Sequence, residues 1–258
     1  MNLELKGKVA VITGSTRGIG KGIAVMLAEE GCKVVICGRT KVTLDKTVSE
    51  LSESRAQVLP VLGDITSAET INTLVQSTLE AFGTIDILVN NVGGNRRNYF
   101  SDTTEDDWQT IINLNLMSHV RMSQSIVPVM KKQGSGSIIF ISSIFGREVG
   151  GPTLSIYNTT KSAIISLAKV MAAELAGHGV RVNSVAPGSI RFPGGSWDKR
   201  YTEDPEKMEE FIAQNLPIGR FGTVEEVANV VCFLASERVS LVTGTCINVD
   251  GCQSRSLI

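Results

Sequence analysis

The sequence predicts an α/β protein built on one doubly wound parallel β-sheet of about seven strands, with helices on both faces. Three observations carry this prediction. Short apolar runs alternate with stretches of helical periodicity, a glycine cluster follows the first run, and no Pro- or Ser-rich linker interrupts the series. Such alternation is typical of βαβ units in one continuous sheet. We therefore expect residues 1–258 to form a single domain.

Each strand is expected where a short apolar run ends in a turn. The first is Lys8–Thr13, closed by Gly14, and the helix that follows it is expected to stop at Gly31. The other strands are expected at Lys33–Cys37, Gln57–Leu62, Ile85–Asn90, Ser137–Ser142, Arg181–Ala186 and Cys246–Val249, and further helices at Lys41–Glu53, Ala68–Phe82 and Tyr157–Ala176.

Two helical segments are apolar on more than one face. They are Asp106–Met130 and Ala163–Ala176. A helix that packs on a sheet needs only one apolar stripe, so the second must be covered by something else. We expect a homo-oligomer, a dimer or a tetramer; coverage by the chain's own loops is the alternative.

Composition narrows the function classes. The 258 residues carry a formal net charge of -1, which gives no reason to expect a nucleic-acid or anionic-membrane partner. No apolar run is long enough to span a bilayer, and Met1–Lys8 is unlike a signal peptide. The five cysteines form no CxxC pair. We expect a cytoplasmic chain with reduced thiols and no metal site.

A glycine-rich loop joins the first strand to its helix. Its spacing is GxxxGxG, and it comprises Gly14, Ser15, Thr16, Arg17, Gly18, Ile19 and Gly20. A tight turn with free backbone amides at a helix N-terminus suits a pyrophosphate. Glycine turns alone are weak evidence, but this position between strand and helix favours a dinucleotide site.

The end of the second strand indicates which dinucleotide. An NAD site usually carries an acid there, whereas this chain has Arg39 and no acid before Asp45. Arg39 and Arg17 could clamp a 2′-phosphate, which favours NADP(H) over NAD(H); the alternative is two solvated arginines. Asp64, after the third strand, is placed to accept from the adenine amino group or to cap the helix near Ser67.

Tyr157 and Lys161 are spaced i, i+4, so they share one face of a helix. A phenol is a poor acid–base catalyst at neutral pH unless a nearby ammonium group lowers its pKa. The pair alone is common on surface helices. Together with the glycine loop and Ser142-Ser143 at the end of the fifth strand, it indicates proton chemistry beside a cofactor.

These motifs occur together in one known family. The chain resembles the short-chain dehydrogenase/reductases, with a Rossmann-type fold, over essentially its whole length. The matching pieces are TGSTRGIG (13–20), NNVG (90–93), NLN (113–115), ISS (141–143), YNTTK (157–161), PG (187–188) and GTCINVDG (244–251).

The resemblance implies a reaction and a site. Tyr157 would be the general acid or base in interconverting a ketone and a secondary alcohol. Lys161 would lower its pKa and hold the nicotinamide ribose. Ser143 would bind the substrate oxygen, and Asn115 would anchor a water that relays protons. Further cofactor contacts would come from Ile65, Asn91, Gly93, Pro187, Gly188 and Ile190, besides Tyr157 and Lys161.

Three positions depart from the family pattern. Val92 replaces a usual alanine, and Phe192 replaces a threonine that often contacts the carboxamide. Ser143 and Tyr157 are one position further apart than is common, so Ser142 stays an alternative for the catalytic hydroxyl.

The substrate is expected to be a small carbonyl or alcohol compound under a lid at residues 189–219, whose glycines and aromatics suit a mobile cover. Arg96, Arg97 and Arg147 could bind an anionic substrate, such as a 3-oxoacyl thioester or a keto acid, or be ordinary surface arginines. A sugar or polyol dehydrogenase is an alternative. An epimerase or dehydratase, and a non-catalytic NADP(H)-binding regulator, are further ones.

Overall fold

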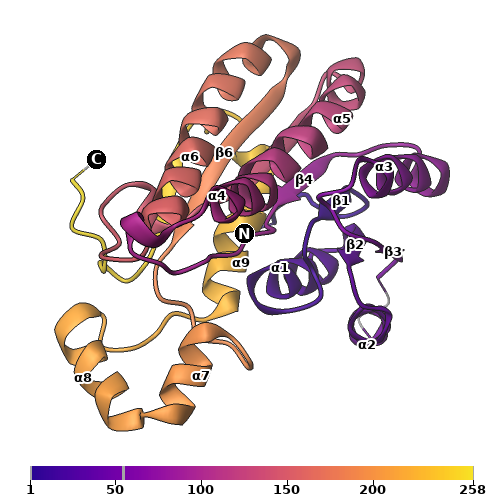
Figure 1. The fold of residues 1–258 in the computed structure, drawn as a ribbon. Coiled ribbons are helices and arrows are strands. Elements are labelled where there is room, and N and C mark those ends of the chain that lie inside the picture. Colours follow the sequence, from indigo (N-terminus) through magenta and orange to yellow (C-terminus); the bar gives the residue numbers. More distant parts are fainter. Residues whose placement is uncertain (1, 54–55, 258) are drawn as a thin grey trace.

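A computed structural model describes residues 2–53 and 56–257 of the chain. Its core is a seven-stranded, all-parallel sheet in the order β3-β2-β1-β4-β5-β6-β7 (Figure 1). The strands are β1 (Val9–Ile12), β2 (Lys33–Gly38), β3 (Val58–Leu62), β4 (Ile87–Asn90), β5 (Gly136–Ile141), β6 (Val180–Pro187) and β7 (Cys246–Val249). The expected fold class is confirmed. The order reverses between β1 and β4, and such switch points bind ligands at the carboxyl ends of the strands.

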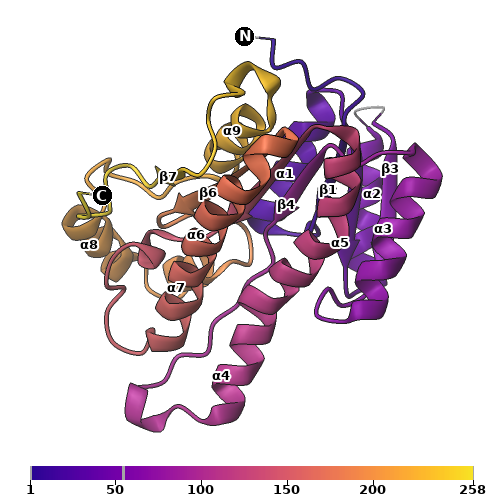
Figure 2. The same ribbon diagram turned by 90° about the horizontal axis from the view of Figure 1, so that it is seen from above.

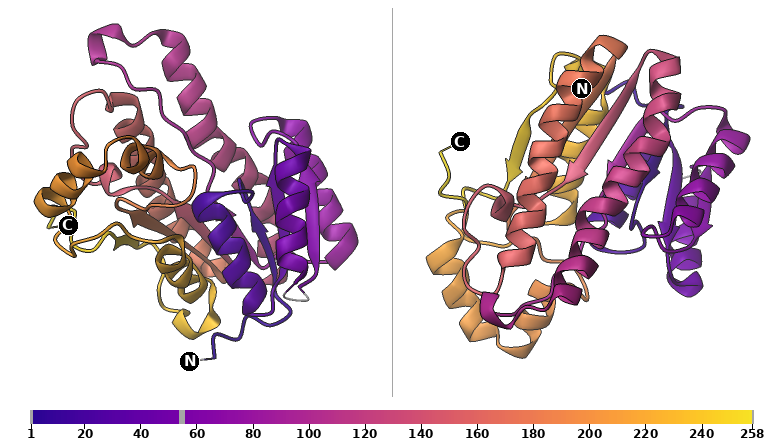
Figure 3. Two further views of the ribbon diagram at one scale, coloured as in Figure 1. Left: turned by 90° about the horizontal axis from the view of Figure 1, so that it is seen from below. Right: turned by 45° about the horizontal axis from the view of Figure 1, so that its top comes forward.

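Helices cover both faces of the sheet (Figure 3). One face is covered by α1 (Gly18–Glu29), α2 (Lys41–Ser52) and α9 (Val224–Ala235), and the other by α3 (Ala68–Phe82), α5 (Ser118–Gln133) and α6 (Ser155–Leu175). Successive residues of β1 point to opposite faces of the sheet. Ala10 and Ile12 pack against the helices of the first face, and Val9 and Val11 pack against those of the second. Burial on both faces explains why these strands are apolar throughout.

The helix expected at Asp106–Met130 is divided. It consists of α4 (Glu105–Ile112), a π-helical turn at Asn113–Met117 and α5. Figure 2 shows the three pieces as one long rod, whose α4 end projects beyond the sheet. A π turn holds one more residue than an α turn and is frequent at functional sites. Spacing alone could not reveal it.

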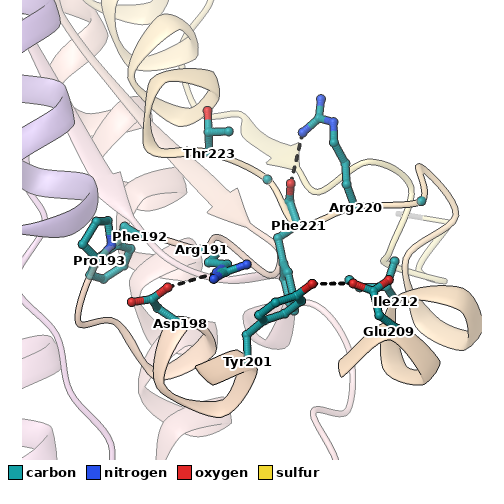
Figure 4. A pocket seen from close by; sticks show the side chains of 12 residues that line it. Arg191, Phe192, Pro193, Asp198, Tyr201, Glu209, Ile212, Arg220, Phe221 and Thr223 are labelled. Atoms are coloured by element: carbon teal, nitrogen blue, oxygen red, sulfur yellow. Dashed lines mark hydrogen bonds and ion pairs between the residues drawn. The ribbon is translucent and has the colours of Figure 1, made fainter. Parts of the chain in front are cut away.

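The lid segment forms two helices, α7 (Ser196–Glu203) and α8 (Pro205–Asn215), set apart from the sheet (Figure 1). They enclose a small apolar cluster of their own, made of Trp197, Tyr201, Met208, Phe211, Ile212, Leu216 and Phe221. Figure 4 shows two polar contacts that fasten it: Arg191 donates to Asp198 at 3.0 Å, and Tyr201 donates to Glu209 at 2.6 Å. The lid is therefore a packed unit joined to the body at its two ends.

The second apolar stripes on α5 and α6 are only partly covered. Val120 and Val127 on α5, and Leu167 on α6, are half-buried, and Val170 is 53% exposed. Within the described residues no helix is long and apolar enough to cross a membrane.

Candidate active site

The catalytic candidates gather where β5 ends and α6 begins. Ser143 is the second residue after β5, and Tyr157 lies in the first turn of α6. The Ser143 hydroxyl accepts from the Phe145 N–H at 3.2 Å and lies near enough to Tyr157 to lower the pKa of the tyrosine. The fold thus brings together two hydroxyl groups that are fourteen positions apart in sequence.

Lys161 lies one turn further along α6 and is buried. Its Nζ atom donates to the Ile141 carbonyl at 2.9 Å and sits 5.7 Å from the centre of the Tyr157 ring. Burial lowers the pKa of Lys161 to about 8, so the amine is largely protonated at neutral pH. The expected pair is in place, with the ammonium group anchored on the main chain of β5.

Burial raises the pKa of Tyr157, while the hydrogen bond with Ser143 and the positive charge of Arg97 act in the opposite direction. From the sequence, Lys161 was expected to lower the pKa of Tyr157. In this structure Ser143 and Arg97 have that effect, because the Lys161 ammonium group is turned to Ile141.

The two serines at the end of β5 have different roles. The Ser142 hydroxyl donates to the main-chain oxygen of Lys161 at 2.8 Å and is buried. It therefore ties β5 to α6. Ser143 is the hydroxyl that faces Tyr157.

Asn115 lies in the π turn and is fully buried. Its side chain accepts from the Gly94 N–H at 2.8 Å and donates to the Gly94 oxygen and the Thr160 hydroxyl, both at 3.0 Å. It thus fastens the loop after β4 to α6. The water relay implied by the family resemblance stays a prediction.

His119, one turn after Asn115, was not identified from the sequence. Its Nε2 atom lies 2.8 Å from the Val92 oxygen. Its pKa is lowered to about 3, mainly because the ring is completely buried and to a smaller extent because Lys161 carries a positive charge nearby. A neutral histidine thus supports the loop after β4; a lone histidine in an apolar helix gives no signal of this.

A pocket of about 280 Å³ opens at the carboxyl ends of β1, β2 and β4. Of the residues predicted to bind the cofactor, those that line it are Gly14, Thr16, Arg17, Gly18, Ile19, Gly20, Arg39, Asp64, Ile65, Asn91 and Gly93. A Cβ on Gly93 would come within 3.2 Å of the Lys161 Nζ, so the pocket adjoins Lys161.

The glycine loop is shaped for close approach. Gly14 and Gly18 have φ angles of +63° and +54°, which favour glycine. A Cβ on Gly20 would collide with the Asn91 side chain and the Gly14 oxygen. No side chain caps the N-terminus of α1, and its first turn has no acidic residue. These features fit a bound diphosphate.

The side of the pocket formed by β2 and β3 carries the groups expected to select the cofactor. The Arg39 guanidinium lies 3.7 Å from the Asp64 carboxylate, and the Arg39 side chain is 74% exposed. Arg17 is exposed as well. Asp64 accepts from the Thr66 N–H and hydroxyl at 2.9 and 2.8 Å, and the N-cap of α3, Ser67, makes no side-chain cap. Asp64 therefore does not cap α3, and its carboxylate instead forms a local turn with Thr66.

Four predicted cofactor residues, Ser15, Pro187, Gly188 and Ile190, do not line this pocket. The Ser15 hydroxyl donates to the Ile12 oxygen and accepts from the Cys37 N–H, and so links β1 to β2. Pro187 ends β6, Gly188 packs on Asp250 and Gln253, and Ile190 is buried beside Gly222.

Six further residues line the pocket at the ends of β1, β2 and β4 and were not predicted as cofactor contacts. They are Cys37, Gly38, Gly63, Val92, Leu114 and Phe192. The Phe192 ring lies directly against the loop, since a Cβ on Gly18 would come within 2.6 Å of it. The position of Phe192 among the aromatic residues of the lid was the one feature of the sequence that could have predicted this contact.

The three candidate anion-binding arginines are placed differently. Arg96 donates to Asp106 and Asp107, each at 2.8 Å, and so supports the start of α4. Arg147 donates to the Cys246 oxygen and the Asn248 side chain, at 3.1 and 3.0 Å. These two have structural roles, and only Arg97 reaches the surroundings of Tyr157.

In the described part of the chain, no three His, Cys, Asp or Glu side chains gather as metal ligands would.

Known proteins are similar to this chain over nearly its whole length. A family model described as enoyl-(acyl carrier protein) reductase matches residues 14–252. The chain is 40% identical over 250 residues to a 3-oxoacyl-acyl-carrier-protein reductase of Thermotoga maritima, covering 96% of this chain and 98% of that protein.

Solved structures agree. L-Sorbose reductase from Gluconobacter frateurii, complexed with NADPH and L-sorbose, has a TM-score of 0.94 at 34% identity over 100% of both chains. A 7α-hydroxysteroid dehydrogenase complexed with NADH has a TM-score of 0.90 at 33% identity, over 100% of this chain and 98% of that one. The chain therefore belongs to the short-chain dehydrogenase/reductase family of oxidoreductases, which act on CH–OH and C=O groups.

Proposed function

We propose that the protein is an NADP(H)-dependent reductase that interconverts a ketone and a secondary alcohol. The observation that carries this proposal is the placement of Lys161, whose amine lies 5.7 Å from the Tyr157 ring, together with Ser143, which is near enough to lower the pKa of Tyr157. Both hydroxyl groups can address one carbonyl oxygen, which is the arrangement that a proton donor and its orienting partner require.

In reduction, the Tyr157 hydroxyl donates its proton to the substrate oxygen while the Ser143 hydroxyl holds that oxygen. The charge that develops on oxygen is thereby neutralised as it forms. The Ser143 hydroxyl and the positive charge of Arg97 favour the phenolate left after proton transfer. The protonated Lys161 amine, 5.7 Å from the tyrosine ring, would hold the nicotinamide ribose beside it. Asn115 holds the loop after β4 in place beside them.

The pocket at the switch point fits NADP(H). The uncapped N-terminus of α1 and the close-packed glycine loop suit the diphosphate, and Arg39 with Arg17 suits a 2′-phosphate. Tyr157 and Lys161 are next to this pocket through Gly93. When bound, the nicotinamide supplies or accepts the hydride.

Two substrate classes are supported by relatives. The 3-oxoacyl-carrier reductase of Thermotoga maritima favours a 3-oxoacyl thioester. The sorbose reductase favours a sugar or polyol. Both present a ketone to the same proton donor.

The protein is also proposed to act as a homo-oligomer in the reducing cytoplasm. The half-buried outer faces of α5 and α6 suit contact with a second copy, and Cys32, Cys37 and Cys232 are buried free thiols. Light scattering at micromolar concentration tests the assembly, and a monomeric mass contradicts it.

The reaction is tested by following the loss of NADPH absorbance with a panel of ketones, for the wild-type protein and for Tyr157→Phe. Reduction by the first and not by the second is expected. Equal rates would remove Tyr157 from the mechanism.

A further inference from the structure

A second pocket, of about 490 Å³, is lined by residues that lie close in sequence to Ser143 and Tyr157. Its floor is made by Ile144 and Phe145, which follow Ser143, and by Leu154, which lies one turn before Tyr157. Its other walls come from the loop after β4 and from the lid. A substrate that presents its carbonyl to Ser143 and Tyr157 has this space for the rest of its body.

The charged groups in this pocket are mostly positive. Arg97 enters from the loop after β4, Arg200 from α7 and Arg255 from the C-terminal segment, against a single acid, Glu148. The Glu148 carboxylate already accepts the main-chain N–H of Arg255 at 2.7 Å. The pocket therefore has an excess of positive charge.

Arg97 and Arg200 are close enough for their charges to interact. The pKa of Arg97 is lowered by partial burial and by the positive charge of Arg200, while Tyr157 acts in the opposite direction. Within residues 2–53 and 56–257, neither guanidinium forms an ion pair with a carboxylate, unlike neighbouring Arg96 and Arg191.

Arg200 is oriented by an aromatic side chain of the pocket. Its guanidinium lies over the Trp197 ring, 4.9 Å from the ring centre, and Trp197 stacks on Phe211. An arginine that is held in this way keeps its forked donors available for a carboxylate or phosphate. Two such groups that repel each other are stabilised by an anion placed between them.

We propose that Arg97 and Arg200 form a subsite for an anionic group, a carboxylate or a phosphate, on the substrate. This subsite lies on the lid side of the reacting carbonyl. The inference rests on the proposed ketone reductase activity and narrows it to substrates that carry a negative charge. Because Arg200 is on α7, the bound anion also links the lid to the loop after β4.

The test compares matched pairs of ketones that differ in charge. Acetoacetate and levulinate are each measured against their methyl esters, and dihydroxyacetone phosphate against dihydroxyacetone. We expect kcat/KM to favour the charged member of at least one pair by about tenfold or more, the range of a charge-assisted hydrogen bond. The preferred pair tells whether a carboxylate or a phosphate is recognised.

The variants are Arg97→Ala, Arg200→Ala and Arg97→Lys. Arg200→Ala should raise KM for the charged ketone about tenfold and leave its neutral partner and kcat little changed. Arg97→Ala should remove the preference for the charged ketone to the same extent, and it should also slow both members of a pair, because Arg97 lowers the pKa of Tyr157. The variant Arg97→Lys should restore part of the preference. Arg238→Ala is the matched control, since Arg238 is an exposed arginine paired with Glu4 and outside the pocket.

Binding to Tyr157→Phe with NADP⁺, measured by calorimetry, separates this inference from the proposed function. The ligands are 3-hydroxybutyrate, glycerol 3-phosphate and their neutral counterparts, methyl 3-hydroxybutyrate and glycerol. If neutral ketones are reduced but charge has no effect on rate or binding in any variant, the anion subsite is wrong and the reductase stands. If no ketone is reduced but a charged ligand binds in an Arg97-dependent way, the subsite stands and the proposed reaction fails.

Discussion

The Lys161 Nζ lies 5.7 Å from the centre of the Tyr157 ring and is held by the Ile141 carbonyl at 2.9 Å. The lysine thus has a fixed place beside the tyrosine that does not depend on a direct contact with its hydroxyl. Burial costs the ammonium group solvation, which brings its pKa down from 10.5 to about 8. The charge next to Tyr157 is therefore present at neutral pH and is lost in mildly alkaline solution.

A pH dependence follows from this shift. The protonated form of Lys161 predominates below pH about 8 in the free protein, so kcat/KM for ketone reduction should fall as pH rises through about 8. The Lys161→Arg variant should keep its charge, and any activity it retains should not fall in that range. A wild-type profile that stays flat to pH about 10 would show that the charge of Lys161 has no part in the reaction.

Arg39 should determine the preference for NADPH. Its exposed guanidinium lies in the cofactor pocket beside Asp64, and a charge-assisted contact with a 2′-phosphate is worth about 1.5–3 kcal/mol. Arg39→Ala should weaken NADPH binding by roughly tenfold to a hundredfold and leave NADH binding nearly unchanged. Fluorescence titration with both cofactors measures this.

Lys41→Ala is the control for Arg39, because Lys41 is an exposed cation two positions later that pairs with Asp45 at 2.9 Å. It should leave both affinities unchanged. Tighter binding of NADH than of NADPH by the wild-type protein would refute the assignment of Arg39.

Gly20 should not tolerate a side chain. A Cβ there would collide with Asn91 and with the Gly14 oxygen, so Gly20→Ala must displace the glycine loop. We expect a loss of about 1–3 kcal/mol in the free energy of unfolding and a weaker affinity for NADPH. Gly177→Ala is the control, since a Cβ at Gly177 meets nothing within 4 Å. Denaturant unfolding measures the free energy of unfolding of both variants. Equal losses in Gly20→Ala and Gly177→Ala would contradict the close packing of the glycine loop.

His119 should make the folded protein sensitive to acid. The folded pKa is about 3 and the ordinary value is 6.5, so below pH 6.5 the unfolded chain takes up a proton that the folded chain does not. Stability then falls with decreasing pH, by about 1.4 kcal/mol per pH unit in this range. Between pH about 7.5 and about 5, before most carboxylates titrate, the loss should approach about 2 kcal/mol.

The variant His119→Gln has no titrating ring and should lose less stability over that interval. Urea unfolding at several pH values measures the slope for both proteins. Identical slopes would mean that His119 is protonated in the folded state.

The alternating strands and helices were predictable because a two-sided sheet imposes continuous apolar strands and one-striped helices. Even the bounds of α3 agree with the expected Ala68–Phe82. The π turn at Asn113–Met117 was not predicted, because no residue type in this segment signals an additional residue in the turn. It became visible only in the backbone of the structure, where it contains the buried Asn115.

Within the site, residue types were easier to predict than partners. Nothing in the sequence distinguishes among Arg96, Arg97 and Arg147. Of the three, only Arg97 lines the second pocket. In the structure Arg96 pairs with Asp106 and Asp107, and Arg147 donates to a main-chain oxygen and an amide oxygen. Those partners come from segments about ten to a hundred positions away, so local pattern could not identify them. Arg200 was missed for the same reason, because only the packing of α7 brings it opposite Arg97.

The central claim is that this chain transfers a hydride between NADPH and a ketone with Tyr157 as the proton donor. Its most direct test is reduction of an active ketone with NADPH that carries deuterium at both C4 positions, followed by mass spectrometry of the alcohol. We predict that the alcohol made by the wild-type protein carries one deuterium on the carbinol carbon. With Tyr157→Phe, product formation should be slower by a factor of about 100 or more. An alcohol without deuterium, or an unchanged rate in the variant, would contradict the account.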